Sequence, residues 1–591
     1  MTPSLIFGLV AVIVTTGNRV SGQEVDTTHG RVTGLRTAVL GKSIDTYYGI
    51  PFAKPPIGDL RFKHPQPIEP WRPEVKNAQS LKPSCQQPTP APNGMSWRTT
   101  PPTFSEDCLY INVWAPASIP TNTNLATMVW IYGGSFTFGS INMPLYAGKY
   151  LAAEKNVIVM SINYRVGAHG FLYLSPDTFP GNQGLMDQTL ALQWIRDNVE
   201  RFGGDANRIT IFGESAGAAS VGHLLLSPKS RDLFTRAILQ SGSPLPVWAA
   251  QEPSAAVGSA RRLAMLANCS ARSDADIYHC IKDLPPGTVL NYQAQVFGIG
   301  GIAFAPVVDG FFLPDTPISL VEKGQMKKTE LLIGVNRNEG TLFLPVSLPT
   351  IFTLSDRLNV SRTQFLVAMR SYAALNGLPS TIVKAIMAQY DEVQVPSLRK
   401  DYVETTDDIL GDSYFKCPAA KLADFYAAAD DVYFYSFDHR LGALVAPAWM
   451  GTFHSAEIEM VFGLPLGNDF TASEAEKITS RSMMTYWANF AKTGNPNLPE
   501  TPGFQWPRYT TDDETYLVFT DAGQRTSQGV RKQQCVFWDT LVPLILENEE
   551  TPPGTTTERV VYVCPNHGSR ISVSLEVLLG VALAALLSFT K

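Results

Sequence analysis

The sequence predicts an α/β fold in which a large central, mostly parallel sheet carries helices on both faces. Continuous apolar runs at 127–132 and 157–163 are typical of strands that are buried on both sides. Apolar residues at helical spacing follow over 184–202. Strand and helix patterns then alternate through 209–226 to 236–240. Because parallel strands need crossover helices between them, this alternation favours a parallel sheet.

Further elements are expected on both sides of this central part. Alternating apolar residues predict a strand region over 31–48 and a strand at 109–114. Downstream, the same criteria predict helical segments at 260–284, 365–390 and 478–492 and strands at 330–336, 432–437 and 516–519. The chain shows no fixed-period repeat and no strong linker before about Glu549. We therefore expect one large domain over 23–548.

The composition is that of an ordinary globular protein. The 591 residues are 45% hydrophobic and 17% charged, and the formal net charge is -6. Nucleic acids attract strongly basic proteins, so this charge gives no reason to expect a nucleic-acid partner. A mildly acidic surface is compatible with a cationic ligand without requiring one.

The first residues, 1–22, have the pattern of a secretory signal peptide. An apolar segment at 5–15 precedes Val20-Ser21-Gly22, which offers a small-residue cleavage site. The alternative is a membrane anchor, but the apolar segment is shorter than the roughly 20 residues that span a bilayer as a helix. We therefore expect residues 1–22 to be removed and the mature protein to be extracellular.

The C-terminal region carries a second targeting pattern. Residues 549–568 are expected to form a Pro- and Thr-rich polar stalk. The tail, 569–591, contains a compact apolar run at 577–589 with only Thr590 and Lys591 behind it. Small residues, a polar spacer and a hydrophobic tail predict a GPI signal, so a lipid anchor would hold the protein in the outer membrane leaflet. A short tail helix or a single transmembrane span are the open alternatives.

The seven cysteines are expected to form disulfides rather than metal sites, because the chain carries a secretory signal. The odd number leaves at least one cysteine for an intermolecular bond, and Cys564 in the stalk is the candidate for linking a homodimer. Asn268 and Asn359 begin N-glycosylation acceptors, which fits the same compartment. No metal cluster and no phosphate-binding loop stands out, so neither a metal nor a cofactor is expected.

The segment Gly213-Glu214-Ser215-Ala216-Gly217 fits the G-x-S-x-G nucleophile elbow, a sharp turn between a strand and a helix. Such a turn exposes the serine hydroxyl, and the glycines leave room for the crossing strand and helix. The alternative is a tight strand–helix turn with an incidental serine. If the elbow is real, the next backbone N–H, that of Ala216, can point at a developing oxyanion.

An elbow serine needs a base and an acid that orients the base, which follow it in the order serine, acid, histidine. His454 lies in a loop-like stretch after a predicted strand and is the best base by position. Glu339 directly follows the strand at 330–336, and catalytic residues of open parallel sheets gather at such strand ends. We therefore interpret Ser215, Glu339 and His454 as a candidate triad.

Several longer motifs occur in a fixed order along the chain. They are SEDCLY at 105–110, WIYGG at 130–134, FGESAG at 212–217, GVN at 334–336 with Glu339-Gly340, His454 with EIE at 457–459, and CVFW at 535–538. With these motifs the chain resembles the type-B carboxylesterase/cholinesterase family, and within it the cholinesterases, from about Gly34 to Ile545.

The resemblance implies an α/β-hydrolase fold and a serine hydrolase that cleaves choline esters through an acyl-enzyme. It implies Ser215 as nucleophile, His454 as base and Glu339 as the orienting acid. The backbone N–H groups of Gly134, Ser135 and Ala216 would form the oxyanion hole. Members of this family usually carry a third glycine where this chain has Ser135, so the serine must adopt the same backbone conformation.

The resemblance also implies binding positions and disulfide pairs. Trp97 would hold the choline ammonium by a cation–π contact, Glu214 would be the gorge carboxylate, and Trp248 and Phe343 would be acyl-side aromatics. Two acyl-pocket positions that are usually phenylalanine fall on Gly300 and Ile302, so we expect a wide pocket that accepts butyryl and propionyl esters as well as acetyl esters. The implied disulfides are Cys85–Cys108, Cys269–Cys280 and Cys417–Cys535, which leaves Cys564 for the dimer bond.

Two rival functions stay open at this point. One is a broad-specificity carboxylesterase, which the missing gorge aromatics favour. The other is a non-catalytic adhesion protein of the neuroligin kind on the same fold, since a fold alone does not fix a function. Such adhesion relatives usually lack a member of the triad, whereas Ser215, Glu339 and His454 are all present here.

Overall fold

The computed structural model describes residues 20–88, 103–117, 124–269, 273–391, 401–442, 446–549, 561–563 and 570–572. The chain forms two compact units. The large unit covers 1–538 and the small unit covers 539–591. All of the candidate triad lies in the large unit.

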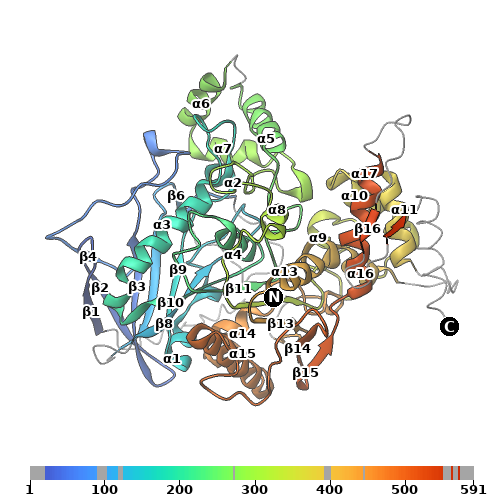
Figure 1. Cartoon of the computed structure of the whole chain (residues 1–591). Coiled ribbons are helices and arrows are strands. Elements are labelled where there is room, and N and C mark those ends of the chain that lie inside the picture. Colours follow the sequence, from blue (N-terminus) through green and yellow to red (C-terminus); the bar gives the residue numbers. More distant parts are fainter. Residues whose placement is uncertain are drawn as a thin grey trace, which may run out of the picture. The chain divides into compact units, whose positions relative to one another are not determined.

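A single large sheet forms the centre of the large unit (Figure 1). Within the described ranges it has thirteen strands, in the order β1 (Val20–Asp26), β2 (Arg31–Val39), β3 (Lys42–Pro51), β7 (Tyr110–Pro116), β9 (Ile158–Ile162), β8 (Leu125–Ile131), β10 (Gly204–Glu214), β11 (Arg236–Gln240), β12 (Leu331–Asn336), β13 (Val432–Phe437), β14 (Thr515–Thr520) and β15 (Gly523–Gln528), with β4 (Val75–Asn77) beside β2. Neighbours from β9 to β14 pair in parallel, and the neighbours at both ends of this order pair antiparallel. The additional strand β4 pairs with β2 in parallel. The predicted mostly parallel sheet is confirmed.

Helices cover both faces of the sheet (Figure 1). On one side α1 (Lys149–Lys155) and α15 (Glu474–Thr493) pack against central strands, and on the other side α3 (Gln183–Asn198), α4 (Ala216–Leu226) and α13 (Cys417–Ala427) do so. The other helices of the unit are α2 (Gly167–Phe171), α5 (Pro253–Leu266), α6 (Asp274–Asp283), α7 (Pro286–Gln293), α8 (Pro317–Glu322), α9 (Leu344–Ser347), α10 (Arg362–Leu375), α11 (Ser380–Tyr390), α12 (Val403–Gly411), α14 (Ile458–Phe462) and α16 (Lys532–Val536). This double cover explains the apolar central strands. All seven side chains of β8 are buried.

Three segments that the sequence predicted as continuous each contain two elements separated by a turn. The region 31–48 contains β2 and β3, which form a hairpin through Leu40 and Gly41, both with positive φ (50° and 77°). The region 260–284 divides into α5 and α6. The region 365–390 divides into α10 and α11, where the chain passes through Gly377 at φ 63°.

The disulfides match the pairing that the resemblance implied. Cys85–Cys108, Cys269–Cys280 and Cys417–Cys535 are all bonded. Cys85 belongs to β5 (Ser84–Cys85), which pairs with β6 (Phe104–Ser105). Asn268 and Asn359 are exposed, as glycosylation acceptors must be. Cys564 lies outside the described residues.

The small unit contains α17 (Val542–Glu549) and a two-stranded antiparallel pair, β16 (Val561–Val563) and β17 (Arg570–Ser572). At the other end of the chain, Val20–Gly22 of the predicted cleavage site belong to β1. Among the described residues no helix is both long and apolar enough to cross a membrane. Most of the predicted signal peptide, stalk and tail lies outside the described residues, so these boundaries stay predictions.

Candidate active site

Ser215 lies at the sharp turn between β10 and α4, with φ 58° and ψ −126°. A non-glycine residue rarely adopts this conformation, so the surrounding packing must hold it. A Cβ on Gly217 would lie 2.1 Å from the carbonyl oxygen of Ile131, and one on Gly213 would lie 2.6 Å from the carbonyl carbon of Gly217. The elbow therefore requires both glycines, and the predicted strand–turn–helix is confirmed.

The loop after β8 lies against the elbow. A Cβ on Gly133 would lie 2.9 Å from the Cβ of Ser215, so this loop passes very close to the serine. Gly134, Ser135 and Phe136 follow with φ values of 111°, 55° and 53°. Ser135 thus adopts the left-handed conformation that the usual glycine would supply. In the described part of the chain, the N–H groups of Gly134, Ser135 and Ala216 donate to no protein acceptor.

Glu339 and His454 meet although they are 115 residues apart in sequence. Glu339 lies in the turn after β12, and His454 lies in the loop between β13 and α14. The Nδ1–H of His454 donates to Oε2 of Glu339 at 2.6 Å, and the N–H of Asn336 donates to Oε1 at 2.6 Å. Both side chains are buried. The carboxylate is therefore fixed at both oxygens and holds one orientation of the imidazole.

The other ring nitrogen of His454 faces the elbow. Its Nε2 lies 3.1 Å from Oε1 of Glu214, the residue directly before Ser215. Burial alone would lower the pKa of His454, but the Glu214 and Glu339 carboxylates outweigh it and raise the pKa above the ordinary 6.5. Ser215 itself is 8% exposed, so it lies at the edge of the water-accessible space. The carboxylates on both sides of the His454 ring therefore favour its protonated form.

A buried polar network supports the acid from behind. Glu457 accepts hydrogen bonds from Nδ2 of Asn336 at 2.6 Å and from Nε2 of Gln240 at 3.0 Å. The indole N–H of Trp487 donates to Oε1 of Gln240 at 2.9 Å. Burial raises the pKa of Glu457. Because these buried oxygens have donors, the network orders the ends of β11 and β12 behind the acid.

A row of aromatic rings runs from the loop after β8 to His454. Phe136 lies 6.3 Å from Trp248, Trp248 lies 5.8 Å from Phe415, and Phe415 lies 4.4 Å from the His454 ring, measured between ring centroids. Phe343 stacks on Phe415 at 5.5 Å. Sequence reasoning missed Phe415, which projects from a π-helical turn, Asp412–Lys416, between α12 and α13. No motif marks it, although π-helical turns often occur at functional sites.

The predicted binding positions are only partly described. A Cβ on Gly300 would lie 3.0 Å from the Cβ of Trp248, so Gly300 borders the aromatic row directly. Ile302 is half-buried two residues further on. The Nε1–H of Trp248 donates to the carbonyl of Tyr414 at 3.1 Å, which fixes its indole. Trp97 lies outside the described residues.

The arrangement can carry out acyl transfer. It joins an elbow serine, a base held by a carboxylate, and backbone N–H groups next to the serine, which are the parts that this chemistry uses. Within the described ranges no group of three or more His, Cys, Asp or Glu residues could hold a metal ion.

Comparison with known proteins gives a consistent picture. The Carboxylesterase family model matches residues 21–538. The chain is 40% identical to an acetylcholinesterase of Bungarus fasciatus over 553 residues, which covers 92% of this chain and 90% of the relative. It is 42% identical to a cholinesterase of Mus musculus over 533 residues, or 88% and 87% of the two chains. It is 38% identical to an acetylcholinesterase of Electrophorus electricus over 565 residues, or 88% of each chain.

Proposed function

The chain belongs to the carboxylesterase family and is a serine carboxylic ester hydrolase, and from this premise we propose that it hydrolyses choline esters through an acyl-enzyme. The observation that carries the proposal is the placement of His454. Its Nδ1 is bonded to Glu339 at 2.6 Å, and its Nε2 faces the elbow that presents Ser215. These two contacts support the assignment of Ser215 as nucleophile, His454 as base and Glu339 as orienting acid.

In the first half of the reaction Ser215 Oγ attacks the ester carbonyl while Nε2 of His454 takes the hydroxyl proton. The N–H groups of Gly134, Ser135 and Ala216 donate to the oxyanion. They are available for this because they donate to no acceptor in the described part of the protein. Glu339 keeps the proton on Nδ1 and stabilises the imidazolium. The imidazolium then gives its proton to the departing alcohol, and an acyl group remains on Ser215.

In the second half a water molecule attacks the acyl-enzyme. His454 Nε2 takes a proton from this water and returns it to Ser215 Oγ as the carboxylic acid leaves. The Glu214 carboxylate, 3.1 Å from Nε2, favours the protonated imidazole that forms in each half. The same base therefore serves both steps without moving between sites.

Choline is the proposed alcohol. The similar proteins of Bungarus fasciatus and Mus musculus are named acetylcholinesterase and cholinesterase. Trp97, the position proposed to hold the ammonium, would contribute up to ~2 kcal/mol if the cation is desolvated over the indole. Glu214 adds a buried carboxylate directly before Ser215.

The acyl side is proposed to be wide. Trp248 and Phe343 provide aromatic wall, whereas Gly300 contributes no side chain against Trp248. With Ile302 as the second smaller residue, we propose that butyryl and propionyl esters are accepted along with acetyl esters. Discrimination of a methylene group is worth only about 1–3 kcal/mol in any hydrophobic pocket.

The first experiment measures kcat/KM of the purified protein on acetylthiocholine, butyrylthiocholine and phenyl acetate, with Ser215→Ala as the control. Choline esters well ahead of phenyl acetate would support the proposal, and the Ser215→Ala rate should fall by at least about 10⁴-fold on every ester. Equal rates on all three esters would favour the broad carboxylesterase. Activity that survives in Ser215→Ala would contradict the assigned nucleophile, and an inactive wild type would favour the adhesion role.

A second comparison separates the cholinesterase from the broad carboxylesterase. Trp97→Ala should reduce kcat/KM on acetylthiocholine by about tenfold or more and leave phenyl acetate nearly unchanged, because only the former carries a cation. A parallel loss on both esters would contradict a choline site at Trp97.

We further propose an extracellular enzyme that is anchored by GPI and linked as a homodimer through Cys564. The three disulfides support an oxidising compartment. Release of activity from intact cells by a phosphatidylinositol-specific phospholipase would support the anchor. A Cys564→Ser protein that still migrates as a dimer without reductant would contradict the link.

A further inference from the structure

The turn that carries Glu339 rests on a carboxylate from another element. Asp407 of α12 is fully buried, and its Oδ1 accepts the N–H of Gly340 at 2.7 Å and that of Thr341 at 3.1 Å. Its Oδ2 accepts Nδ2–H of Asn338 at 2.9 Å. We call residues 337–341, which carry Glu339, the acid turn. Three donors of the acid turn, on both sides of Glu339 in sequence, therefore converge on one side chain.

Asn338 extends this support to the segment that precedes the base. Its Oδ1 accepts the N–H of Thr452 at 3.1 Å, and its own N–H donates to the carbonyl of Thr452 at 3.0 Å. Thr452 lies two residues before His454. Asp407, through Asn338, thus links the acid turn to the base loop, although the two are far apart in sequence.

The turn and the helix pack so closely that no side chain fits at Gly340. A Cβ on Gly340 would lie 2.5 Å from the carbonyl oxygen of Asp407, and one on Gly411 would lie 3.4 Å from the Cβ of Glu339. Because there is no room for the turn to shift toward α12, the contact with Asp407 fixes where Glu339 sits.

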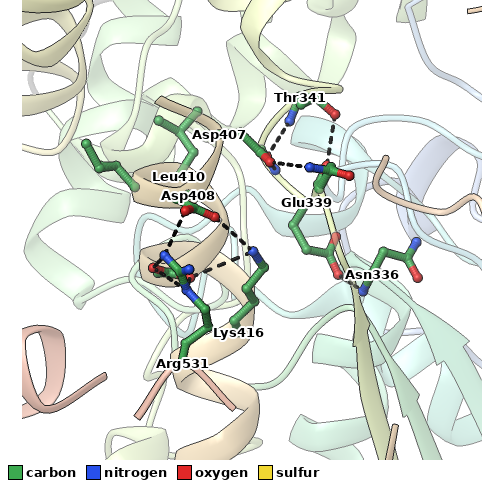
Figure 2. Close-up of polar contacts among 12 residues, drawn as sticks. Asn336, Glu339, Thr341, Asp407, Asp408, Leu410, Lys416 and Arg531 are labelled. Carbon is green, nitrogen blue, oxygen red and sulfur yellow. Dashed lines mark hydrogen bonds and ion pairs between the residues drawn. The ribbon is translucent and has the colours of Figure 1, made fainter. Parts of the chain in front are cut away.

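The neighbouring residue, Asp408, points the other way. Figure 2 shows Asp407 directed at Thr341 and the acid turn, whereas Asp408 is directed at Lys416 and Arg531. Asp408 lies 2.9 Å from Arg531 and 3.5 Å from Lys416. The two aspartates share a helix and an ionic surrounding, but only Asp407 contacts the acid turn.

We propose that Asp407, as an ionised carboxylate, is a positioning residue that holds Glu339 and the His454 loop in register for the esterase reaction. This inference rests on the proposed function, because it assigns the residue a part in that reaction. Asp407 touches neither substrate nor reacting atoms and acts through the acid turn.

The substitution Asp407→Asn disturbs the register with a minimal change of shape. The amide oxygen can still accept from Gly340 and Thr341. The new amide N–H₂ then faces Nδ2 of Asn338, a donor against a donor, so Asn338 must turn away from either Asp407 or Thr452. We expect kcat to fall by about 10- to 100-fold, since a displacement of about 1 Å in a catalytic constellation costs that much. KM should change by less than about twofold, because no binding contact is removed.

Asp408→Asn is the matched control, because it removes the same charge from the same helix and leaves the acid turn intact. Both variants are assayed on acetylthiocholine at about pH 8, where carboxylates are ionised. Rates are divided by the concentration of serine that a fluorophosphonate titrates, which removes any effect of misfolded protein. Asp408→Asn should keep kcat within about twofold of the wild type.

The pH profile gives a second readout that a merely structural residue would not move. Burial raises the pKa of Asp407 to about 7. The positive charge of Lys416 lowers this pKa, and the negative charge of Asp408 raises it further. Asp412, Arg531 and the Glu339–His454 pair are the other charged groups around it. On the acid side the wild type should therefore lose kcat more steeply than a single titrating group allows, because His454 and Asp407 both take up protons. Asp407→Asn should show the slope of one group.

The outcomes separate the two proposals. A fall in kcat confined to Asp407→Asn would support the positioning role. Equal kcat for the two variants, in an active wild type, would overturn it alone. A wild type without Ser215-dependent hydrolysis would overturn the proposed function and this inference with it. If Asp407→Asn is not secreted, Asn338→Ala tests the same link from its other end and should lower kcat likewise.

Discussion

The candidate site contains two regions that are built in opposite ways. The rear region consists of Asn336, Glu339, Asp407 and Glu457, and it includes the carboxylate that is bonded to Nδ1 of His454. The front region consists of Ser215, Gly134–Phe136 and Gly300–Ile302. The rear carboxylates of Glu339, Asp407 and Glu457 are fully buried, and each accepts at least two hydrogen bonds. In the front region, by contrast, N–H groups of the described chain are left without protein acceptors.

The difference shows which polar groups have their hydrogen-bond partners within the protein and which are available to a ligand. Buried polar groups that are fully bonded stabilise one arrangement, whereas unused donors next to a nucleophile await a charge that exists only during the reaction. Rear changes should therefore lower the rate on every ester alike. Within the front region, changes at Gly300–Ile302 should alter which ester is preferred.

The largest expected effect comes from the centre of the rear region. Glu339→Gln removes the negative charge that holds the Nδ1 proton of His454, so the wrong tautomer forms, and kcat should fall by about 10⁴-fold. The loss should be equal on acetylthiocholine and phenyl acetate, measured as kcat per titrated serine. A loss that falls on only one of the two esters would break the distinction between the regions. Thermal unfolding of the variant controls for damage to the fold.

In the front region, Ile302→Phe should change selectivity rather than rate. A phenyl ring beside Gly300 would narrow the acyl pocket, so the butyryl/acetyl ratio of kcat/KM should fall by about tenfold, within the range of hydrophobic discrimination. Ile302→Leu, which keeps the volume, is the control and should leave the ratio near its original value. An unchanged ratio in Ile302→Phe would mean that residue 302 does not face the acyl group.

The pH profile tests the charge that Glu214 adds on the Nε2 side. Only neutral His454 can act as a base, so kcat/KM is lost as the pH falls through the pKa of His454. The Glu214 carboxylate raises this pKa, so Glu214→Gln should move the acid limb to lower pH, by about one unit or less. The measurement is kcat/KM on phenyl acetate across the acid range. A limb that moves to higher pH would contradict the assigned cause.

The smallest expected effect is that of Ser135→Gly. A serine at φ 55° is strained by about 1–2 kcal/mol, which glycine relieves, while the backbone N–H stays in place. The rate should therefore stay within about twofold and the melting temperature should rise slightly. A tenfold fall in kcat would instead show that the Ser135 hydroxyl takes part in the reaction.

The sequence predicted the residues that belong to a motif better than those that support the site from other elements. Ser215 and its glycines form one contiguous motif, and Glu339 and His454 follow in a known order, so short patterns sufficed. Asp407 and Phe415 belong to no motif. Their roles depend on where a π-helical turn places them against distant segments, and periodicity contains no such information.

The prediction of the fold was likewise good for some elements and poor for others. The bounds of buried strands such as β8 and β11 were predicted to within two residues. A continuous apolar run between turn residues is typical of a buried strand, so the pattern is distinct. Edge elements such as β1 and β15 were missed, since short polar strands at a sheet edge have no distinct pattern. The split of α10 from α11 depends on a short turn with Gly377 at positive φ, which the helical periodicity conceals.

The cluster of charged residues behind the acid turn limits which substitutions the protein can accept during evolution. Lys416 is 4% exposed among Asp407, Asp408 and Asp412, with Arg531 as the second cation. A lone buried charge is strongly disfavoured, so the aspartates around Lys416 make its charge tolerable, and an apolar residue at 416 would leave a fully buried carboxylate such as Asp412 without its cation. Lineages that descend from this gene should therefore change these positions in pairs. A descendant with an apolar residue at 416 should also lack one of the three aspartates.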